Sequence, residues 1–130
     1  LLNGRNGDDY LFGRTENDLL IGSGGRGRLR GNAGNDTLEG GGKNDFLQGG
    51  TGADYFVFNT DDGHWGKDYV RDFELGTDRI VLDGFDASDI TWKPLKTGEG
   101  VMAVVKGGGK IVFNGHNTSD LDTFADWDFV

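Results

Sequence analysis

Six nonapeptides that follow one another without a gap decide how this chain folds: GRNGDDYLF (4–12), GRTENDLLI (13–21), GSGGRGRLR (22–30), GNAGNDTLE (31–39), GGGKNDFLQ (40–48) and GGTGADYFV (49–57). Position one is Gly in all six, and position six is Asp in five, with Gly27 as the exception. Position eight is always large and apolar. Such registry identifies an internal repeat, which a Gly-rich linker would not maintain. The residues Leu1-Leu2-Asn3 fit the last three positions of a preceding unit.

The repeat has a physical interpretation. Gly at the loop positions allows positive φ and the close approach of stacked backbones. The last three residues of each unit alternate, so that position eight points inward and its two neighbours point outward. A narrow core should therefore form from the residues at position eight, which are Leu11, Leu20, Leu29, Leu38, Leu47 and Phe56. One large apolar residue in nine makes a thin core, in a chain that is only 35% apolar and contains 25 Gly. Burial alone would hardly offset the ordering entropy of such a chain.

The charged residues indicate what else holds the fold together. All but four of the 22 acidic residues are Asp, which suits tight loops and, with loop carbonyls, hard cations such as Ca²⁺. The net charge of −9 argues against nucleic acid as a partner. The chain has no Cys, hence no disulfide, and no apolar run long enough to predict a membrane span. No signal peptide is visible, and the start inside a repeat indicates a piece of a longer protein.

The nonapeptides match the pattern G-G-x-G-x-D-x-U-x and are identified as RTX calcium-binding repeats. GGTGADYFV matches at every fixed position, and GNAGNDTLE departs only at position two. The resemblance implies an all-β fold, a right-handed parallel β-roll. In it, six residues make a loop, three make a short strand, and two repeats complete one turn.

Two repeats per turn place alternate loops on opposite edges of the roll. Edge A stacks loops 13–18, 31–36 and 49–54, and edge B stacks loops 4–9, 22–27 and 40–45. The resemblance implies Ca²⁺ between neighbouring loops, held by position-six carboxylates and backbone carbonyls. We expect two good sites on edge A, Asp18/Asp36 and Asp36/Asp54, the second better because Glu16 replaces a loop Gly in the first. The expected carbonyls lie near Gly31, Ala33, Gly34, Gly50 and Gly52.

Edge B carries Asp9, Gly27 and Asp45, so its middle carboxylate is missing and its sites should be weak or empty. One hypothesis is that the guanidinium groups around this gap partly replace Ca²⁺ beside Asp9 and Asp45. Those groups belong to Arg26, Arg28 and Arg30. A last edge-B site beyond the repeats could join Asp45 to Asp61, Asp62 or Asp68.

The nonapeptide phase stops after residue 57, which divides the chain into repeats (1–57) and a C-terminal β region (58–130). Strands are predicted at 68–73, 78–82, 90–93, 101–105 and 110–113, the last two forming a hairpin around the triplet Gly107-Gly108-Gly109. This region should cap the roll, because an uncovered end would expose sheet edges.

The resemblance also implies a function: a Ca²⁺-dependent folding switch in a secreted, extracellular bacterial protein. DYVRDFELGTDRIVL (68–82) is similar to the post-repeat segment of RTX exoproteins, and GHNTSDLDTFADWDFV (115–130) is similar to their C-terminus, which a type I secretion apparatus reads. The chain itself is not expected to be an enzyme. Its only histidines are His64 and His116, and it contains neither H-E-x-x-H nor G-x-S-x-G. Catalysis would belong to an upstream domain.

The alternative function is an accessory module that binds an anionic polysaccharide such as alginate, because RTX repeats also build modules of alginate epimerases and lyases. On a β-roll, Tyr10, Arg28 and Phe46 would form one outward column, and Arg14, Arg26 and Arg30 add positive charge. The same column could instead be intramolecular cation–π packing, or a contact with a missing upstream domain.

Overall fold

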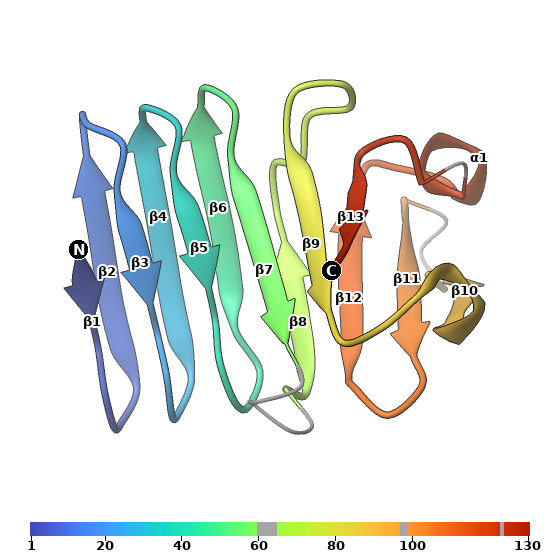
Figure 1. The fold of residues 1–130 in the computed structure, drawn as a ribbon, viewed down its shortest axis with the longest axis horizontal. Helices are drawn as coiled ribbons and strands as arrows, with labels where there is room; N and C mark the ends of the chain where they lie inside the picture. Colours follow the sequence, from blue (N-terminus) through green and yellow to red (C-terminus); the bar gives the residue numbers. More distant parts are fainter. Residues whose placement is uncertain (60–64, 97–98, 123) are drawn as a thin grey trace.

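Two β-sheets face each other along the length of the molecule (Figure 1). The structure is a computed structural model that describes residues 1–59, 65–96, 99–122 and 124–130. Sheet A follows the loops of edge A and contains, in order, β1 (Leu2–Asn3), β3 (Leu19–Ile21), β5 (Thr37–Glu39), β7 (Tyr55–Asn59), β9 (Arg79–Asp83) and β13 (Trp127–Phe129). Sheet B follows edge B and contains β2 (Asp9–Arg14), β4 (Gly27–Ala33), β6 (Phe46–Thr51), β8 (Lys67–Val70), β12 (Lys110–Asn114), β11 (Gly100–Val105) and β10 (Ile90–Pro94).

The strands of the repeats pair in parallel with a shift of two nonapeptides. In sheet A, Leu2 pairs with Leu20 and Leu20 with Leu38. In sheet B, Leu11 pairs with Leu29 and Leu29 with Leu47. Position eight therefore stacks on position eight. This confirms the predicted parallel β-roll with two repeats per turn.

The core of the roll is the predicted column of position-eight residues. Leu20, Leu38, Leu47 and Phe56 are fully buried, and Leu29 is nearly so. Leu11 is only partly buried because it lies in β2, at the uncapped end. Burying a Leu side chain stabilises the fold by about 1.5–3 kcal/mol. The packing supplied by each repeat is correspondingly small.

The parallel ladder continues past the repeats before the cap begins. β8 pairs with β6, placing Val70 beside Leu47, and β9 pairs with β7, placing Ile80 beside Phe56. β12 then adds in parallel to β8, and β11 and β10 complete sheet B in antiparallel fashion. All five strands predicted after residue 57 are present within a few residues of their expected bounds, and β11–β12 is the predicted hairpin. The division at residue 57 stays a prediction.

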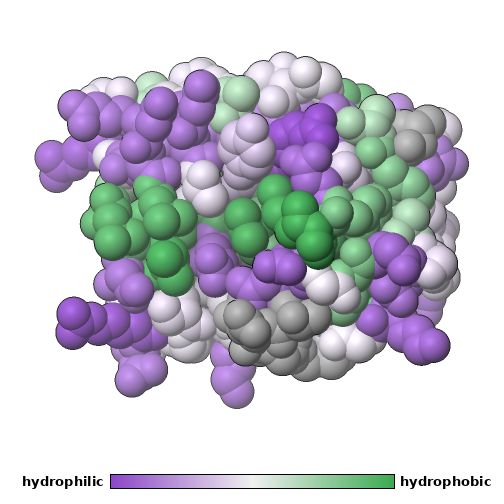
Figure 2. All heavy atoms as spheres, in the orientation of Figure 1, coloured by the Kyte–Doolittle hydropathy of each residue, from purple (hydrophilic) through white to green (hydrophobic). Residues whose placement is uncertain are grey.

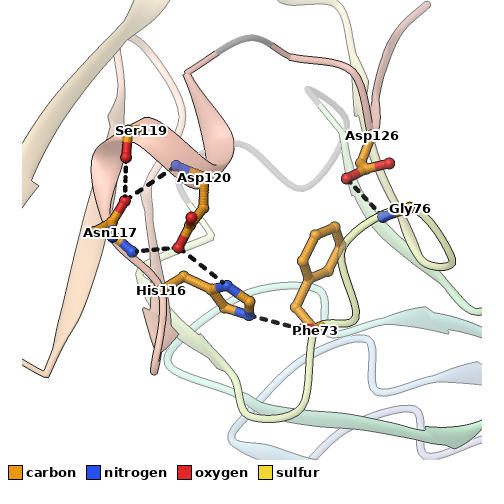
Figure 3. Close-up of polar contacts among 7 residues, drawn as sticks. All are labelled: Phe73, Gly76, His116, Asn117, Ser119, Asp120 and Asp126. Carbon is orange, nitrogen blue, oxygen red and sulfur yellow. Dashed lines mark hydrogen bonds and ion pairs between the residues drawn. The ribbon is translucent and has the colours of Figure 1, made fainter.

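Three cap elements were not predicted: the 3-10 helix η2 (Ala87–Asp89), helix α1 (Thr118–Leu121) and strand β13. Asn117 caps α1, its side chain accepting from Asp120 N while the Asp120 side chain accepts from Asn117 N. The spacing N-x-x-D, a form of capping box, was the available sequence signal. His116 precedes the helix, and its Nε2 lies 2.7 Å from the carbonyl oxygen of Phe73 (Figure 3).

Strand β13 closes sheet A at the capped end. Trp127 is buried between Trp92 and Phe113, at ring-centroid distances of 5.7 Å and 5.9 Å. The guanidinium of Arg79 binds both carboxylate oxygens of Asp128. The chain end thus belongs to the folded cap. No helix in the described ranges is long and apolar enough to cross a membrane.

The roll also carries apolar side chains on its outside. Figure 2 shows a band of hydrophobic atoms along the length of the molecule, bordered by hydrophilic atoms. On sheet A, Leu19 is exposed, and Ile21, Val57 and Val81 are partly buried. The thin interior is therefore not the only place where apolar residues gather.

Candidate metal centre

Aspartates at position six form a hydrogen-bonded ladder along edge A. The backbone N–H of Asp18 donates to Oδ1 of Asp36 (2.7 Å), and that of Asp36 donates to Oδ1 of Asp54 (2.8 Å). The ladder continues to a residue that was not predicted, because Asp54 N donates to Oδ1 of Asp78 (3.0 Å). Each carboxylate therefore uses one oxygen to hold the preceding turn.

The second oxygen of these carboxylates has no such role. Oδ2 of Asp36 and Oδ2 of Asp54 are buried without a hydrogen-bond partner among the described residues, as is Oδ2 of Asp9 on edge B. A Cβ at Gly31 or Gly49 would collide with the Oδ2 of Asp36 or Asp54, so each oxygen lies inside its own loop. A buried acceptor without a donor is costly. These oxygens are placed as cation ligands would be.

Backbone carbonyls supply further oxygen atoms between the loops of edge A. A Cβ at Gly50 would collide with the carbonyl oxygen of Asn32, and one at Gly52 with that of Gly34. The carbonyls at 32 and 34 therefore face the next loop. Gly31 is similarly stacked against loop 49–54, while Ala33 belongs to β4 and pairs with Thr51. A set of carboxylates and carbonyls suits Ca²⁺.

Edge B has the predicted gap. Gly27 N donates to Oδ1 of Asp45 (2.5 Å), but Gly27 offers no carboxylate to the loop that contains Asp9. Above it, Asp45 N donates to Oδ1 of Asp68 (2.8 Å), so Asp68 occupies the position-six place of the next turn. The other candidates, Asp61 and Asp62, lie outside the described residues.

The arginines near the gap point outward. Arg28 is exposed, and its guanidinium lies 5.4 Å from the ring centroid of Tyr10 and 5.3 Å from that of Phe46. The described part of the chain contains no ion pair between Asp9 and an arginine. The hypothesis that guanidinium groups replace Ca²⁺ beside Asp9 therefore receives no support.

Burial raises the pKa of two carboxyl groups on edge A. Desolvation raises the pKa of Asp54 to about 6, against the lowering effect of the Asp36 N–H; the charges of Asp78, Asp36 and Asp72 raise it further. Desolvation also raises the pKa of Asp36, and the N–H of Asp18 opposes it. Burial and like charge both disfavour the ionised form. A bound cation would remove both penalties.

No three acidic or histidine side chains converge on one point in the described ranges. An ion between two loops would therefore take most of its ligands from carbonyls and one carboxylate from each loop. A ligand set of several carbonyls and two carboxylates suits a hard cation with six to eight oxygen ligands.

Two aspartates that accept hydrogen bonds from the loop backbone were not among the predicted site residues. Asp78 takes the next place in the edge-A ladder, and Asp72 accepts from the N–H groups of Gly49 (2.9 Å) and Gly50 (2.8 Å). The signal for Asp78 was the segment Gly76-Thr77-Asp78-Arg79-Ile80, which repeats positions four to eight of the nonapeptide. The nonapeptide pattern does not include Asp72, whose sequence signal was its place in segment 68–82, which is similar to the post-repeat segment of RTX exoproteins.

The outer face of sheet B carries a continuous aromatic and cationic column. Tyr10, Arg28, Phe46 and Tyr69 lie in register, and the rings of Phe46 and Tyr69 stack at 5.0 Å with planes 10° apart. Two surface hollows flank the column. One is lined by Arg28, Leu29, Arg30, Phe46, Gln48 and Arg71, and the other by Asp8, Tyr10, Arg26, Gly27, Arg28, Asn44 and Phe46. Arg14, at the far end of β2, lines neither.

Comparison with known proteins gives two kinds of match. The profile of the RTX calcium-binding nonapeptide repeat, in four copies, matches residues 1–29 and 30–64. No curated protein matches the chain in sequence.

Solved structures match the fold over nearly the whole chain. The AlgE6R3 subunit of the mannuronan C5-epimerase from Azotobacter vinelandii is 27% identical at a TM-score of 0.74, covering 96% of this chain and 78% of that chain. The AlgE6R2 subunit of the same enzyme is 26% identical at 0.71, covering 98% and 91%. The extracellular lipase LipA from Serratia marcescens shares the fold alone, at 21% identity and 0.54, with 20% of its length covered. Residues 1–64 therefore belong to the RTX calcium-binding nonapeptide-repeat family, and the described repeats form a β-roll similar to the R subunits of that epimerase.

Proposed function

We propose that this chain is a calcium-binding module whose repeats fold when Ca²⁺ binds. The observation that carries the proposal is the pair of buried Oδ2 atoms of Asp36 and Asp54, which lack hydrogen-bond partners in the described structure and lie inside loops whose backbone carbonyls face the neighbouring loop. Ca²⁺ supplies the positive charge that offsets the burial and mutual repulsion of these carboxylates.

The sites differ between the two edges. On edge A, Asp18/Asp36 and Asp36/Asp54 would each hold an ion, so Asp36 serves both sites. On edge B, Asp45 and Asp68 complete one pair of position-six carboxylates. The sites on either side of Gly27 have a carboxylate from one loop only and should be weak.

Calcium dependence would suit a bacterial protein that folds after export. At low cytosolic Ca²⁺, carboxylate repulsion would keep the repeats unfolded and able to pass a type I secretion apparatus. At extracellular Ca²⁺, mass action would favour the folded roll. The module would then stabilise a larger exoprotein whose catalytic domain lies elsewhere in the chain. The resemblance to subunits of an epimerase supports attachment to an enzyme of this kind.

Isothermal titration with Ca²⁺ tests the metal sites. Asp36→Asn should lower the affinity and the number of bound ions most, because it affects two sites. Asp83→Asn removes the same charge from an exposed position at the end of β9 and serves as the matched control. If Asp36→Asn binds Ca²⁺ like the wild type, the assigned sites are wrong.

A second candidate function is binding of an anionic polysaccharide on the outer face of sheet B. The stacked column Tyr10–Arg28–Phe46–Tyr69 offers flat rings for sugar faces. The hollow beside it brings Arg28, Arg30 and Arg71 together around Gln48, which suits carboxylated sugars. The similarity to subunits of a mannuronan epimerase favours a uronate polymer.

Titration of the Ca²⁺-loaded module with alginate oligomers, followed by NMR shifts, tests this surface. Arg30→Ala and Phe46→Ala should weaken binding, and Arg14→Ala should not, since Arg14 lines neither hollow. Equal losses for Arg30→Ala and Arg14→Ala, with no loss for Phe46→Ala, would indicate unspecific charge attraction and rule out the column.

A further inference from the structure

The nonapeptide pattern continues in degenerate form beyond the sixth repeat, which ends at residue 57. GHWGKDYVR (63–71) has the expected residue type at positions one, four, six and eight, and FELGTDRIV (73–81) has it at positions four, six and eight. Their strands β8 and β9 place Val70 on Leu47 and Ile80 on Phe56, position eight on position eight. These segments are thus the seventh and eighth repeats, and they add one turn to the roll.

The seventh repeat keeps the geometry of a calcium-type loop in its described part. Gly66 has a φ of 97°, and a Cβ there would collide with the carbonyl oxygen of Lys43, as one at Gly52 would with Gly34. Lys67 N donates to Oδ1 of Asn44 (2.9 Å), as Ala53 N does to Asn35 (2.9 Å). In its described residues, the seventh repeat therefore stacks on loop 40–45 as the earlier loops stack on one another.

The eighth repeat ends edge A differently. Oδ1 of Asp78 accepts from Asp54 N (3.0 Å), and its Oδ2 accepts from Glu74 N (2.9 Å). The two oxygens of Asp72 accept from Gly49 N and Gly50 N. All four carboxylate oxygens are thus satisfied by backbone donors, in contrast to the buried Oδ2 of Asp36. Gly76 has open space around its Cβ position, so this loop does not stack on loop 49–54 as the repeats do.

The turn made by these two repeats also has a more aromatic core than the others. Trp65 is buried against Phe58 and Phe85, both at 5.4 Å between ring centroids. Phe73 packs on Phe56 at 6.2 Å and on Phe113 at 5.6 Å. Buried aromatic rings dominate core energetics, whereas each of the first five repeats contributes a single Leu at position eight.

We propose that the eighth repeat binds no metal and holds the sixth repeat on the cap without Ca²⁺. We call the eighth repeat the metal-free rung. The calcium-free protein then keeps a folded template from about residue 49 onward, and Ca²⁺ binding folds residues 4–48 onto it. This inference rests on the proposed calcium-driven folding, and it limits the dependence on Ca²⁺ to residues 4–48.

Amide hydrogen exchange of the whole chain, in chelator and in saturating Ca²⁺, tests the boundary. In chelator, the amides of Gly49, Gly50 and Asp54 should be protected, and those of Asp18, Gly27 and Asp36 should exchange freely. Ca²⁺ should protect all six. If the first three also exchange freely in chelator while Ca²⁺ protects all six, only the metal-free rung is wrong. If Ca²⁺ changes nothing, the proposed function fails and this inference fails with it.

Asp78→Asn and the matched Asp36→Asn distinguish the metal-free rung from the proposed Ca²⁺ sites of edge A. In chelator, Asp78→Asn should reduce protection of the Asp54 amide by about tenfold or more, since the acceptor of this hydrogen bond loses its charge. Asp36→Asn should leave that protection unchanged and weaken only the response to Ca²⁺. The opposite pattern would overturn the assignment.

Discussion

Asp54 shows at the scale of one residue why the repeats need a cation. Its carboxyl group is fully buried, holds the N–H of Asp36 through one oxygen, and has like charges on both sides in Asp36 and Asp78. Its pKa is raised to about 6. The position-six pattern identified this residue and its partner Asp36, but not the degree of burial, which depends on stacking of the loops.

This shift predicts how the calcium-free protein responds to pH. Because the pKa of Asp54 is higher in the folded state than in the unfolded state, the folded state binds the proton more tightly. The resulting stabilisation is fully present below about pH 4 and is lost as pH rises through 6. In chelator, the thermal midpoint should therefore be higher at pH 4.5 than at pH 7.5, and Asp54→Asn should flatten the difference. A midpoint that rises toward pH 7.5 would contradict the assigned burial.

At the scale of the element, the third repeat should weaken Ca²⁺ binding on edge B. Its loop stacks normally, with Gly27 N bound to Asp45, yet it supplies no carboxylate. A Cβ at Gly27 would lie 2.7 Å from Cδ1 of Leu29 and 3.2 Å from Oδ1 of Asp45, which are side-chain atoms and not backbone atoms. The absence of Asp at position 27 should therefore affect metal binding, and the backbone conformation does not require Gly at this position.

Gly27→Asp should restore the ladder on edge B. In saturating Ca²⁺ the variant should bind more ions and melt at a higher temperature, because both neighbouring sites gain a carboxylate. In chelator its melting temperature should stay that of the wild type, because residues 4–48 are unfolded without Ca²⁺ and the new charge then lies in an unfolded segment. Calorimetry with and without Ca²⁺ measures both effects. Gly24→Asp, in the same loop but at position three, is the control. A variant destabilised under both conditions would refute the predicted gain.

At the scale of the whole molecule, the regular part was predictable and the cap only partly so. A strict period fixed the register of β2 to β7, because slipping one residue would turn the Leu column outward. Alternation and Gly turns located β8 to β12. Strand β13 was not predictable, because Trp127 and Phe129 become a strand only by pairing with β9, far away in sequence. Asp72 likewise acquires its role only when the turn carries it to Gly49 and Gly50.

Far-UV circular dichroism during a Ca²⁺ titration from a chelator-treated start tests the central claim most directly. We predict a modest β signal from the cap without Ca²⁺ and a cooperative gain of β structure as the repeats fold. A spectrum that is the same in chelator and in saturating Ca²⁺ would contradict calcium-driven folding.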